Sequence, residues 1–370
     1  MDTPIALRRG RVAAVVLASA LLAAACSSGT SSNSSADTGS GSGDTTATGA
    51  TFTPEEVAAA TGSYKVKPLF AVPKKLPKKY RITFLSPGKS LPFFATWSKG
   101  MQDAAKFYGV DFQDADLNFK YEDELSAYQQ LAVKQPDVVG SQVMNGPVYN
   151  AITRDGAKVV MVDGTYEKAP HFGVPDDAVG QLTIKQLEGP AKAKLDTTWK
   201  GRTLQVVGMS APNCGPCDAR VKAAFAQAKT DLGVSDAQTT MLTPQGQDPT
   251  TSSQSTFADF LTAHPHDPVI VMSYGDEPVL GALNAAKAAN RTGDLLAVTS
   301  GGDEAARAAV RDTSNKDMLI GSIDFQPYAE GWNYIEAAIA TAMGKSFDAY
   351  DVSRVLTAAN VDTFYPDDKK

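Results

Sequence analysis

From residue 81 onward the chain alternates between short apolar runs and longer stretches that are amphipathic or rich in alanine. The apolar runs span residues 81–85, 138–139, 159–162, 204–207, 269–272, 295–298 and 319–323. Helical spacing of the apolar residues marks residues 93–108, and the segments 219–232 and 278–289 also read as helices. Short buried strands that alternate with helices predict parallel sheets joined by right-handed crossovers. The predicted fold class is therefore α/β, with doubly wound sheets.

The first 25 residues have the pattern of an export signal. Three arginines between residues 8 and 11 precede residues 12–25, which are small or apolar except for Ser19. This run is shorter than the about 20 residues that a membrane-spanning helix needs, and it fits the h-region of a signal peptide. The sequence Ala23-Ala24-Ala25-Cys26 resembles the lipobox of bacterial lipoproteins, although Ala23 stands where that motif usually has Leu. The resemblance implies an extracytoplasmic protein that lipidated Cys26 anchors to the cell membrane. Ordinary secretion with an incidental cysteine is the alternative.

Residues 26–79 are predicted to link this anchor to the folded body. Residues 27–51 are almost entirely Ser, Gly, Thr, Ala and Asp. Such a segment cannot bury enough apolar surface to offset the entropy of ordering it, so we expect a flexible coil that reaches on the order of 30 Å. Four lysines between residues 74 and 79 are interpreted as part of a solvated connector.

Length and charge narrow the possible partners. The chain has 370 residues and a net charge of −6, which becomes −8 when three Arg and one Asp leave with residues 1–25. An acidic body without clusters of Lys and Arg argues against a nucleic-acid partner. About 290 residues remain from Tyr80 onward, enough for two lobes of ordinary domain size. We expect the protein to act as a monomer.

The loops that follow the apolar runs are the candidates for a functional site, because ligands of doubly wound sheets bind beyond the carboxyl ends of the strands. These loops carry aromatic residues, carboxylates and one arginine, but no His and no Ser beside a plausible base. The candidate residues are Phe93, Phe94, Asp163, Arg220, Tyr274, Asp276, Phe325 and Gln326. This content favours a binding site over a catalytic one.

Several of these segments resemble the type I periplasmic binding proteins of ABC transporters, especially the sugar-binding branch. The similar segments are the strand at 82–86 with Pro92-Phe93-Phe94-Ala95, the strand at 159–162 that ends in Asp163, the loop 274–277 with the helix after it, and residues 331–343. The resemblance implies two lobes joined by a three-stranded hinge, with crossings near 174–177, 325–327 and 347–353. Residues 80–176 and 328–346 would form one lobe, and residues 177–327 and 347–370 the other.

The resemblance also assigns roles to the candidate residues. Phe93 and Phe94 would stack on the apolar face of a sugar ring, Asp163 would accept hydrogen bonds from ligand hydroxyls, and Arg220 would donate to ligand oxygens. Either phenylalanine has core packing as its alternative role, and Asp163 has capping of the next turn. Leu91, Gly275, Gly301 and Phe325 stand where the family usually has hydrogen-bonding side chains. We therefore expect a cavity more apolar than a typical sugar site.

Cys214-Gly215-Pro216-Cys217 reproduces the spacing of a thioredoxin-type redox motif. Asn213 and Asp218 flank it, where that motif usually has Trp and Lys. Outside the cell, two cysteines at this spacing readily form a disulfide, which would shape the loop near Arg220. His171, His264 and His266 share no spacing with the cysteines that would complete a zinc site, so we expect no metal and no cofactor.

Two functions follow from these patterns. The first is a non-enzymatic, membrane-tethered solute receptor that closes two lobes around a small polar ligand and delivers it to an ABC permease. The second is an extracytoplasmic thiol-disulfide oxidoreductase that uses Cys214 and Cys217. A DNA-binding regulator is excluded by export and by the lack of an N-terminal helix-turn-helix pattern.

Overall fold

The computed structural model describes residues 49–212, 214–246, 248–347 and 354–369. The signal peptide, Cys26 and linker residues 26–48 lie outside the described residues, as do residues 348–353 of the third predicted crossing. In the described part of the chain, no helix is both long enough and apolar enough to cross a membrane.

The first lobe is built on a five-stranded parallel sheet with the order β2-β1-β3-β4-β5. Its strands are β1 (Arg81–Ser86), β2 (Asp111–Asp116), β3 (Val138–Ser141), β4 (Lys158–Val162) and β5 (His171–Phe172). Its connecting helices are α2 (Pro92–Tyr108), α3 (Glu124–Ala132) and α4 (Gly146–Arg154). Helix α2 ends where Gly109 adopts a left-handed conformation and its N–H bonds to the carbonyl of Ala105, in agreement with the helix predicted over residues 93–108.

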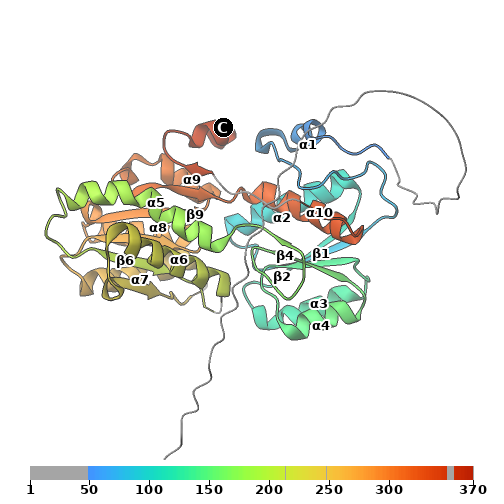
Figure 1. Ribbon diagram of the computed structural model, residues 1–370, viewed down its shortest axis with the longest axis horizontal. Helices are drawn as coiled ribbons and strands as arrows, with labels where there is room; N and C mark the ends of the chain where they lie inside the picture. The colour runs from blue at the N-terminus through green and yellow to red at the C-terminus, as the bar shows by residue number, and fades with distance from the viewer. Residues whose placement is uncertain (1–48, 213, 247, 348–353, 370) are drawn as a thin grey trace, which may run out of the picture. The chain divides into compact units, whose positions relative to one another are not determined.

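The second lobe is built on a six-stranded sheet with the order β11-β10-β9-β8-β6-β7, in which only β11 is antiparallel. The strands are β6 (Gln205–Met209), β7 (Thr239–Leu242), β8 (Val269–Ser273), β9 (Leu295–Gly301), β10 (Leu319–Asp324) and β11 (Val355–Leu356). The helices are α5 (Asp176–Leu195), α6 (Gly215–Leu232), α7 (Pro249–Ala263), α8 (Asp276–Ala288), α9 (Glu304–Arg311) and the short α11 (Val361–Phe364). The two sheets with flanking helices confirm the predicted doubly wound α/β class (Figure 1).

Helix α10 (Pro327–Ala342) follows the last long strand of the second lobe but packs in the first lobe, against α2 (Figure 1). The two helices lie so close that a Cβ at Gly100 would collide with the carbonyl oxygen of Tyr328. Trp97 of α2 and Trp332 of α10 are both fully buried in the same core. The chain therefore returns to the lobe in which it began, so residues far apart in the sequence share one core.

The segment before β1 departs from the sequence prediction. Residues 49–79 were expected to continue the flexible linker, but Val57, Val66, Leu69 and Val72 are buried in the first-lobe core. The segment includes α1 (Pro54–Thr61), which begins with a capping box between Thr53 and Glu56. The polar composition ends near Thr51, and the apolar residues beyond it provide the burial that orders this segment.

Six short 3-10 helices complete the described structure: Gly62–Tyr64, Tyr121–Asp123, Asp236–Gln238, Thr292–Asp294, Thr313–Asn315 and Pro366–Lys369.

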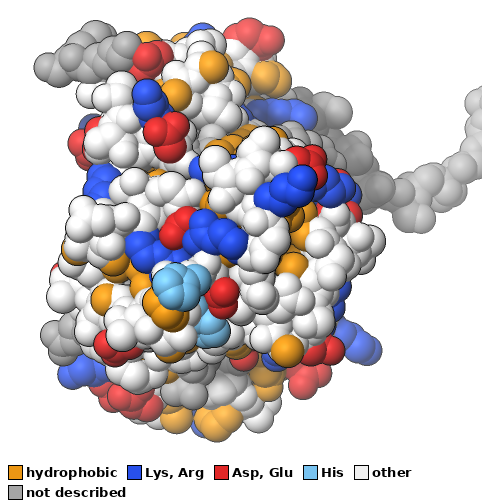
Figure 2. All heavy atoms as spheres, turned by 90° about the vertical axis from the view of Figure 1, so that its left-hand side faces the viewer, with side chains coloured by type: hydrophobic (Ala, Val, Ile, Leu, Met, Phe, Trp, Pro, Cys, Tyr) orange, Lys and Arg blue, Asp and Glu red, His pale blue; other side chains and the backbone are white. Residues whose placement is uncertain are grey.

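Figure 2 shows a face of the second lobe on which His side chains lie among Lys, Arg, Asp and Glu side chains. His264 pairs with Asp267, and Arg291 donates to the carbonyls of His264 and Asp267. These contacts hold the loop between α7 and β8 in place.

Candidate functional site

A cavity of about 470 Å³ lies at the carboxyl ends of strands from both lobes. It is lined by Phe93, Phe94, Asp163, Arg220, Tyr274, Asp276 and Phe325, so seven of the eight predicted residues meet at one place. The eighth, Gln326, is not part of the described lining. Its backbone is left-handed, with φ of 55°, and its N–H bonds to Oδ1 of Asp324. Gln326 therefore belongs to the turn that starts α10.

The aromatic side of the cavity begins at the first turn of α2. The rings of Phe93 and Phe94 meet edge to face with centroids 5.2 Å apart, and Phe93 meets Phe325 in the same way at 6.2 Å. Phe93 and Phe94 are half-buried, and Phe93 packs against the cores of both lobes. Phe93 therefore packs in the core and also lines the cavity, although the sequence analysis treated these two roles as alternatives.

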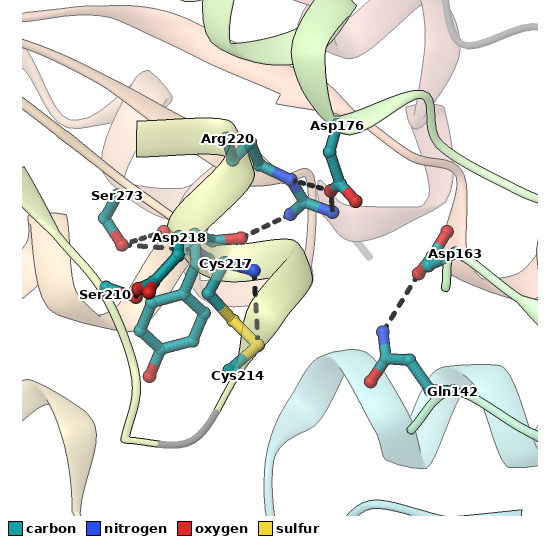
Figure 3. Close-up of a disulfide and its surroundings, with 11 residues drawn as sticks. Gln142, Asp163, Asp176, Ser210, Cys214, Cys217, Asp218, Arg220 and Ser273 are labelled. Atoms are coloured by element: carbon teal, nitrogen blue, oxygen red, sulfur yellow. Dashed lines mark hydrogen bonds and ion pairs between the residues drawn. A yellow bond between two sulfur atoms is a disulfide. The ribbon is translucent and has the colours of Figure 1, made fainter. Parts of the chain in front are cut away.

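Arg220 of α6 is held by contacts within the second lobe and its entry segment (Figure 3). Its Nε and Nη2 lie 2.7 Å from Oδ1 of Asp176, and its Nη1 donates to the carbonyl of Tyr274 at 2.6 Å. Its guanidinium also lies over the ring of Phe325, 4.8 Å from the centroid. Arg220 therefore ties the first residue of α5 to the loop after β8, a role that the sequence prediction did not include.

Asp176 is the partner that sequence reasoning missed. Asp176 lies at the first predicted crossing. From the sequence alone, a carboxylate in the first turn of a helix indicates only a favourable interaction with the helix dipole. Burial raises the pKa of Asp176 to about 6, although the positive charge of Arg220 acts in the opposite direction. This carboxyl consequently titrates close to neutral pH.

Asp163 follows β4 in a left-handed conformation, with φ of 62°. Its Oδ1 accepts the N–H of Val174 at 2.8 Å, and its Oδ2 accepts the side-chain amide of Gln142 at 3.0 Å (Figure 3). The bond to Val174 spans 11 residues, so it ties Asp163 to the first crossing and is not a cap of the turn that follows β4. Because Asp163 is half-buried and lines the cavity, it also remains within reach of a ligand.

Two adjacent carboxylates, Asp276 and Glu277, open helix α8 and line the cavity from the second lobe. Oδ2 of Asp276 accepts the N–H of Asp303, and its Oδ1 accepts the hydroxyl of Ser322. Burial and the negative charge of Asp303 raise the pKa of Asp276 above its usual range. Burial also raises the pKa of Glu277 to about 7. The sequence singled out Asp276 but not Glu277, because only Asp276 matched the family pattern.

The CxxC loop forms part of the cavity wall through Cys214, Pro216 and Cys217. The two cysteines are joined as a disulfide, with Cα atoms 5.2 Å apart (Figure 3). Sγ of Cys214 accepts the N–H of Cys217 at the start of α6, and the hydroxyl of Ser210 donates to Asp218 nearby. The cysteine pair therefore fixes the helix that carries Arg220.

The comparisons with known proteins identify the family. A model of the periplasmic binding protein domain matches residues 82–346, so the chain belongs to this family. The sequence resemblance to periplasmic binding proteins is thereby confirmed, and nothing in the comparisons supports the thiol-disulfide oxidoreductase. No curated protein matches the chain.

Several solved structures share the fold. An ABC transporter solute-binding protein from Mycobacterium smegmatis with bound glycerol is 22% identical, with a TM-score of 0.64 over 77% of this chain and 96% of that one. A periplasmic solute-binding protein of an ABC transporter from Actinobacillus succinogenes 130z with bound D-allose is 17% identical, with a TM-score of 0.64 over 77% and 100% of the two chains. A 5-methylthioribose transporter solute-binding protein from Thermotoga lettingae TMO is 18% identical, with a TM-score of 0.64 over 78% and 90%.

Proposed function

We propose that this protein is a membrane-tethered, extracytoplasmic receptor that captures a small polar solute between its two lobes and delivers it to an ABC permease. The observation that carries the proposal is the cavity at which both lobes meet. It joins Phe93 and Asp163 of the first lobe to Arg220 and Tyr274 of the second. A ligand that contacts both sides gains more contacts when the lobes approach, which favours closure.

A sugar, a polyol or a sugar-like molecule is the class of ligand that suits this lining. The C–H face of a sugar ring packs on aromatic rings such as Phe93 and Phe94, and its hydroxyls bond to carboxylates. Glycerol and D-allose are the ligands bound in two of the structures that share the fold. The proposed role is binding without catalysis.

Hinge bending would act on the segments that join the lobes. At the first crossing, Asp163 of the first lobe accepts the N–H of Val174, whose side chain packs in the second-lobe core, and Arg220 holds Asp176. The second crossing is fixed by Asp324, which accepts the N–H of Gln326 and bonds to Arg354 and Tyr365. We expect closure to rotate the lobes about these crossings, while the bonds at each side stay intact.

The anchor and the monomeric state belong to the same proposal. Residues 1–25 would be removed during export, and lipidated Cys26 would hold the mature protein at the membrane. The linker would let the folded body move near its permease, and one copy of the chain contributes residues from both lobes to the cavity. The Cys214–Cys217 disulfide would act as a structural staple of the cavity wall.

A binding experiment tests this function. Purified protein is screened against sugars, polyols and small acids by thermal denaturation, because a ligand of the native state raises the melting temperature. Calorimetry then gives the affinity of each hit for the wild type, Arg220→Ala and the double variant Cys214→Ser/Cys217→Ser. We expect at least about a tenfold loss in Arg220→Ala and a much smaller loss in the double variant. The opposite order would refute the receptor assignment.

A further inference from the structure

The charged side chains that line the cavity are unevenly balanced. Its described lining contains the carboxylates of Asp163, Asp248, Asp276 and Glu277, and Arg220 as the single cation. The charge of Arg220 is already opposed by Asp176, at 2.7 Å. A ligand that enters the cavity therefore meets an excess of negative charge, which disfavours anions.

One of the two carboxylate oxygens of the buried Glu277 lacks a hydrogen-bond partner in the described structure. This oxygen is Oε1, and only 8% of the residue is exposed. The hydroxyls of Ser253 and Ser300, two fully buried residues of the same lining, are also without partners among the described residues. Buried polar atoms are almost always bonded in native proteins, so a ligand in the cavity is one source of the contacts that these three atoms lack.

The charges around Glu277 leave a cation as the matching partner. Asp303 at the start of α9, Asp248 at the start of α7 and Asp276 beside it on α8 are all acidic. Burial raises the pKa of Glu277 to about 7, and the charge of Asp303 acts in the same direction. The carboxyl is thus held partly protonated at neutral pH, and a positive charge next to it would displace the proton.

A glycine faces each of the two α8 carboxylates, but only Gly275 leaves open space. A Cβ at Gly275 would lie 3.5 Å from Oε2 of Glu277, within ordinary contact distance. Gly301 has φ of +142°, and a Cβ there would lie 2.5 Å from Oδ2 of Asp276, so that only glycine fits. The room that a side chain would occupy next to Glu277 is therefore open to a ligand atom.

We propose that the solute is a ring compound of sugar size that carries a protonated amine, and that Glu277 binds this amine. The hydroxyls of Ser253 and Ser300 lie on the same lining and accept or donate hydrogen bonds to the polar edge of the ring. Phe93, Phe94 and Phe325 pack against its apolar face, and aromatic faces also attract a cation. This inference rests on the proposed function, because it assigns the chemical class of the solute that the cavity receives.

Paired probes of equal shape test the charge. Calorimetry at pH 8 compares 4-aminocyclohexanol with cyclohexane-1,4-diol, and tyramine with tyrosol, with D-glucose and D-allose as neutral sugars. We expect each amine to bind at least about tenfold tighter than its alcohol, because the amine gains one charge-assisted hydrogen bond. Glu277→Gln should lower the affinity for the amines at least about tenfold and for the alcohols less than about threefold. Glu277→Asp, which keeps the charge, should retain the preference for the amine.

The matched control is Glu304→Gln, which removes the same charge from an exposed position in the first turn of α9. Its affinities should equal those of the wild type. A second readout is pH. Because Glu277 titrates near pH 7, affinity for the amines should rise about tenfold from pH 6 to pH 8 in the wild type. In Glu277→Gln the rise should be less than about threefold, which leaves room for the ionisation of Asp176 beside Arg220.

The outcomes separate this inference from the proposed function. If the neutral sugars or alcohols bind as well as the amines, or if Glu277→Gln weakens both members of a pair equally, the cationic ligand is refuted while the receptor remains. If none of the probes binds, including the sugars, both the inference and the sugar-like ligand are refuted.

Discussion

Replacing Arg220 by alanine should destabilise the fold in a way that depends on pH. The ion pair with Asp176 is buried, with 7% and 14% of the two side chains exposed. Removing one partner of a buried pair leaves an uncompensated charge and typically costs about 3–5 kcal/mol. At pH 8, where Asp176 is ionised, we expect Arg220→Ala to lower the free energy of unfolding by this amount.

The cost should shrink as the pH falls. With a folded-state pKa of about 6, Asp176 is raised above its unfolded value near 3.8, so its protonated form is favoured in the folded state. A neighbouring Arg lowers the pKa of an aspartate by about 1–3 units, and each unit is worth about 1.4 kcal/mol. Without Arg220 the folded-state pKa therefore rises further. Because pH 8 lies only about two units above the wild-type pKa of about 6, the loss of stability at pH 8 exceeds the loss at pH 5 by about 1.3–2.7 kcal/mol.

Urea unfolding followed by tryptophan fluorescence at pH 5 and pH 8 measures this difference. The double variant Arg220→Ala/Asp176→Asn should recover most of the loss at pH 8, because it removes the unpaired charge. The matched control is Arg154→Ala, whose pair with Asp155 is exposed at 71% and 37% and should be worth at most about 1 kcal/mol. Equal losses at pH 5 and pH 8, with no recovery in the double variant, would refute the buried-charge argument.

Three further predictions concern the anchor, the helix contact and a second buried carboxyl. Cys26→Ala should move the protein from the membrane fraction to the soluble fraction without changing its melting temperature, since stable anchoring needs the several acyl chains of a lipoprotein; retention of the variant in high salt would contradict this. Gly100→Ala should destabilise the first lobe by about 1–3 kcal/mol, because the added Cβ would collide with the carbonyl oxygen of Tyr328. The control is Gly189→Ala on α5, where the added Cβ meets nothing; urea unfolding should show that this variant is neutral or slightly stabilising. Burial raises the pKa of Glu336 to about 7, above its unfolded value near 4.5. The folded protein therefore favours the protonated form of Glu336, and the contribution of this group to the free energy of unfolding is present below pH 4.5 and is lost as the pH rises through 7. Glu336→Gln should therefore flatten the fall in unfolding free energy between pH 5 and pH 8, by up to roughly 3 kcal/mol, and an unchanged slope would show that another group controls it.

Much of the site could be predicted because the architecture itself places it. Once the apolar runs are interpreted as parallel strands, the loops at their carboxyl ends must gather at one edge, and seven of the eight chosen residues line one cavity. What the loops did not reveal is which side chains pair. Arg220 and Asp176 are 44 positions apart, and nothing in the local sequence of either one indicates the other.

The sequence by itself determined the central strands and the alternation of strand and helix. The four strands that it failed to predict, β2, β5, β7 and β11, all lie at sheet edges. An edge strand is solvated on one side and needs no continuous apolar run, so β2 reads Asp-Phe-Gln-Asp-Ala-Asp and β7 is nowhere fully buried.

Only the tertiary structure decided that residues 49–79 are ordered and which groups surround the buried carboxylates. Residues such as Val57 and Leu69 become fixed only because the core formed by α2 and α10 offers them a surface, and that core joins segments more than two hundred residues apart. The same holds for Glu277, whose raised pKa comes from burial and from Asp303 on another helix. Local patterns record periodicity and loop composition, whereas burial and pairing depend on which distant segments meet.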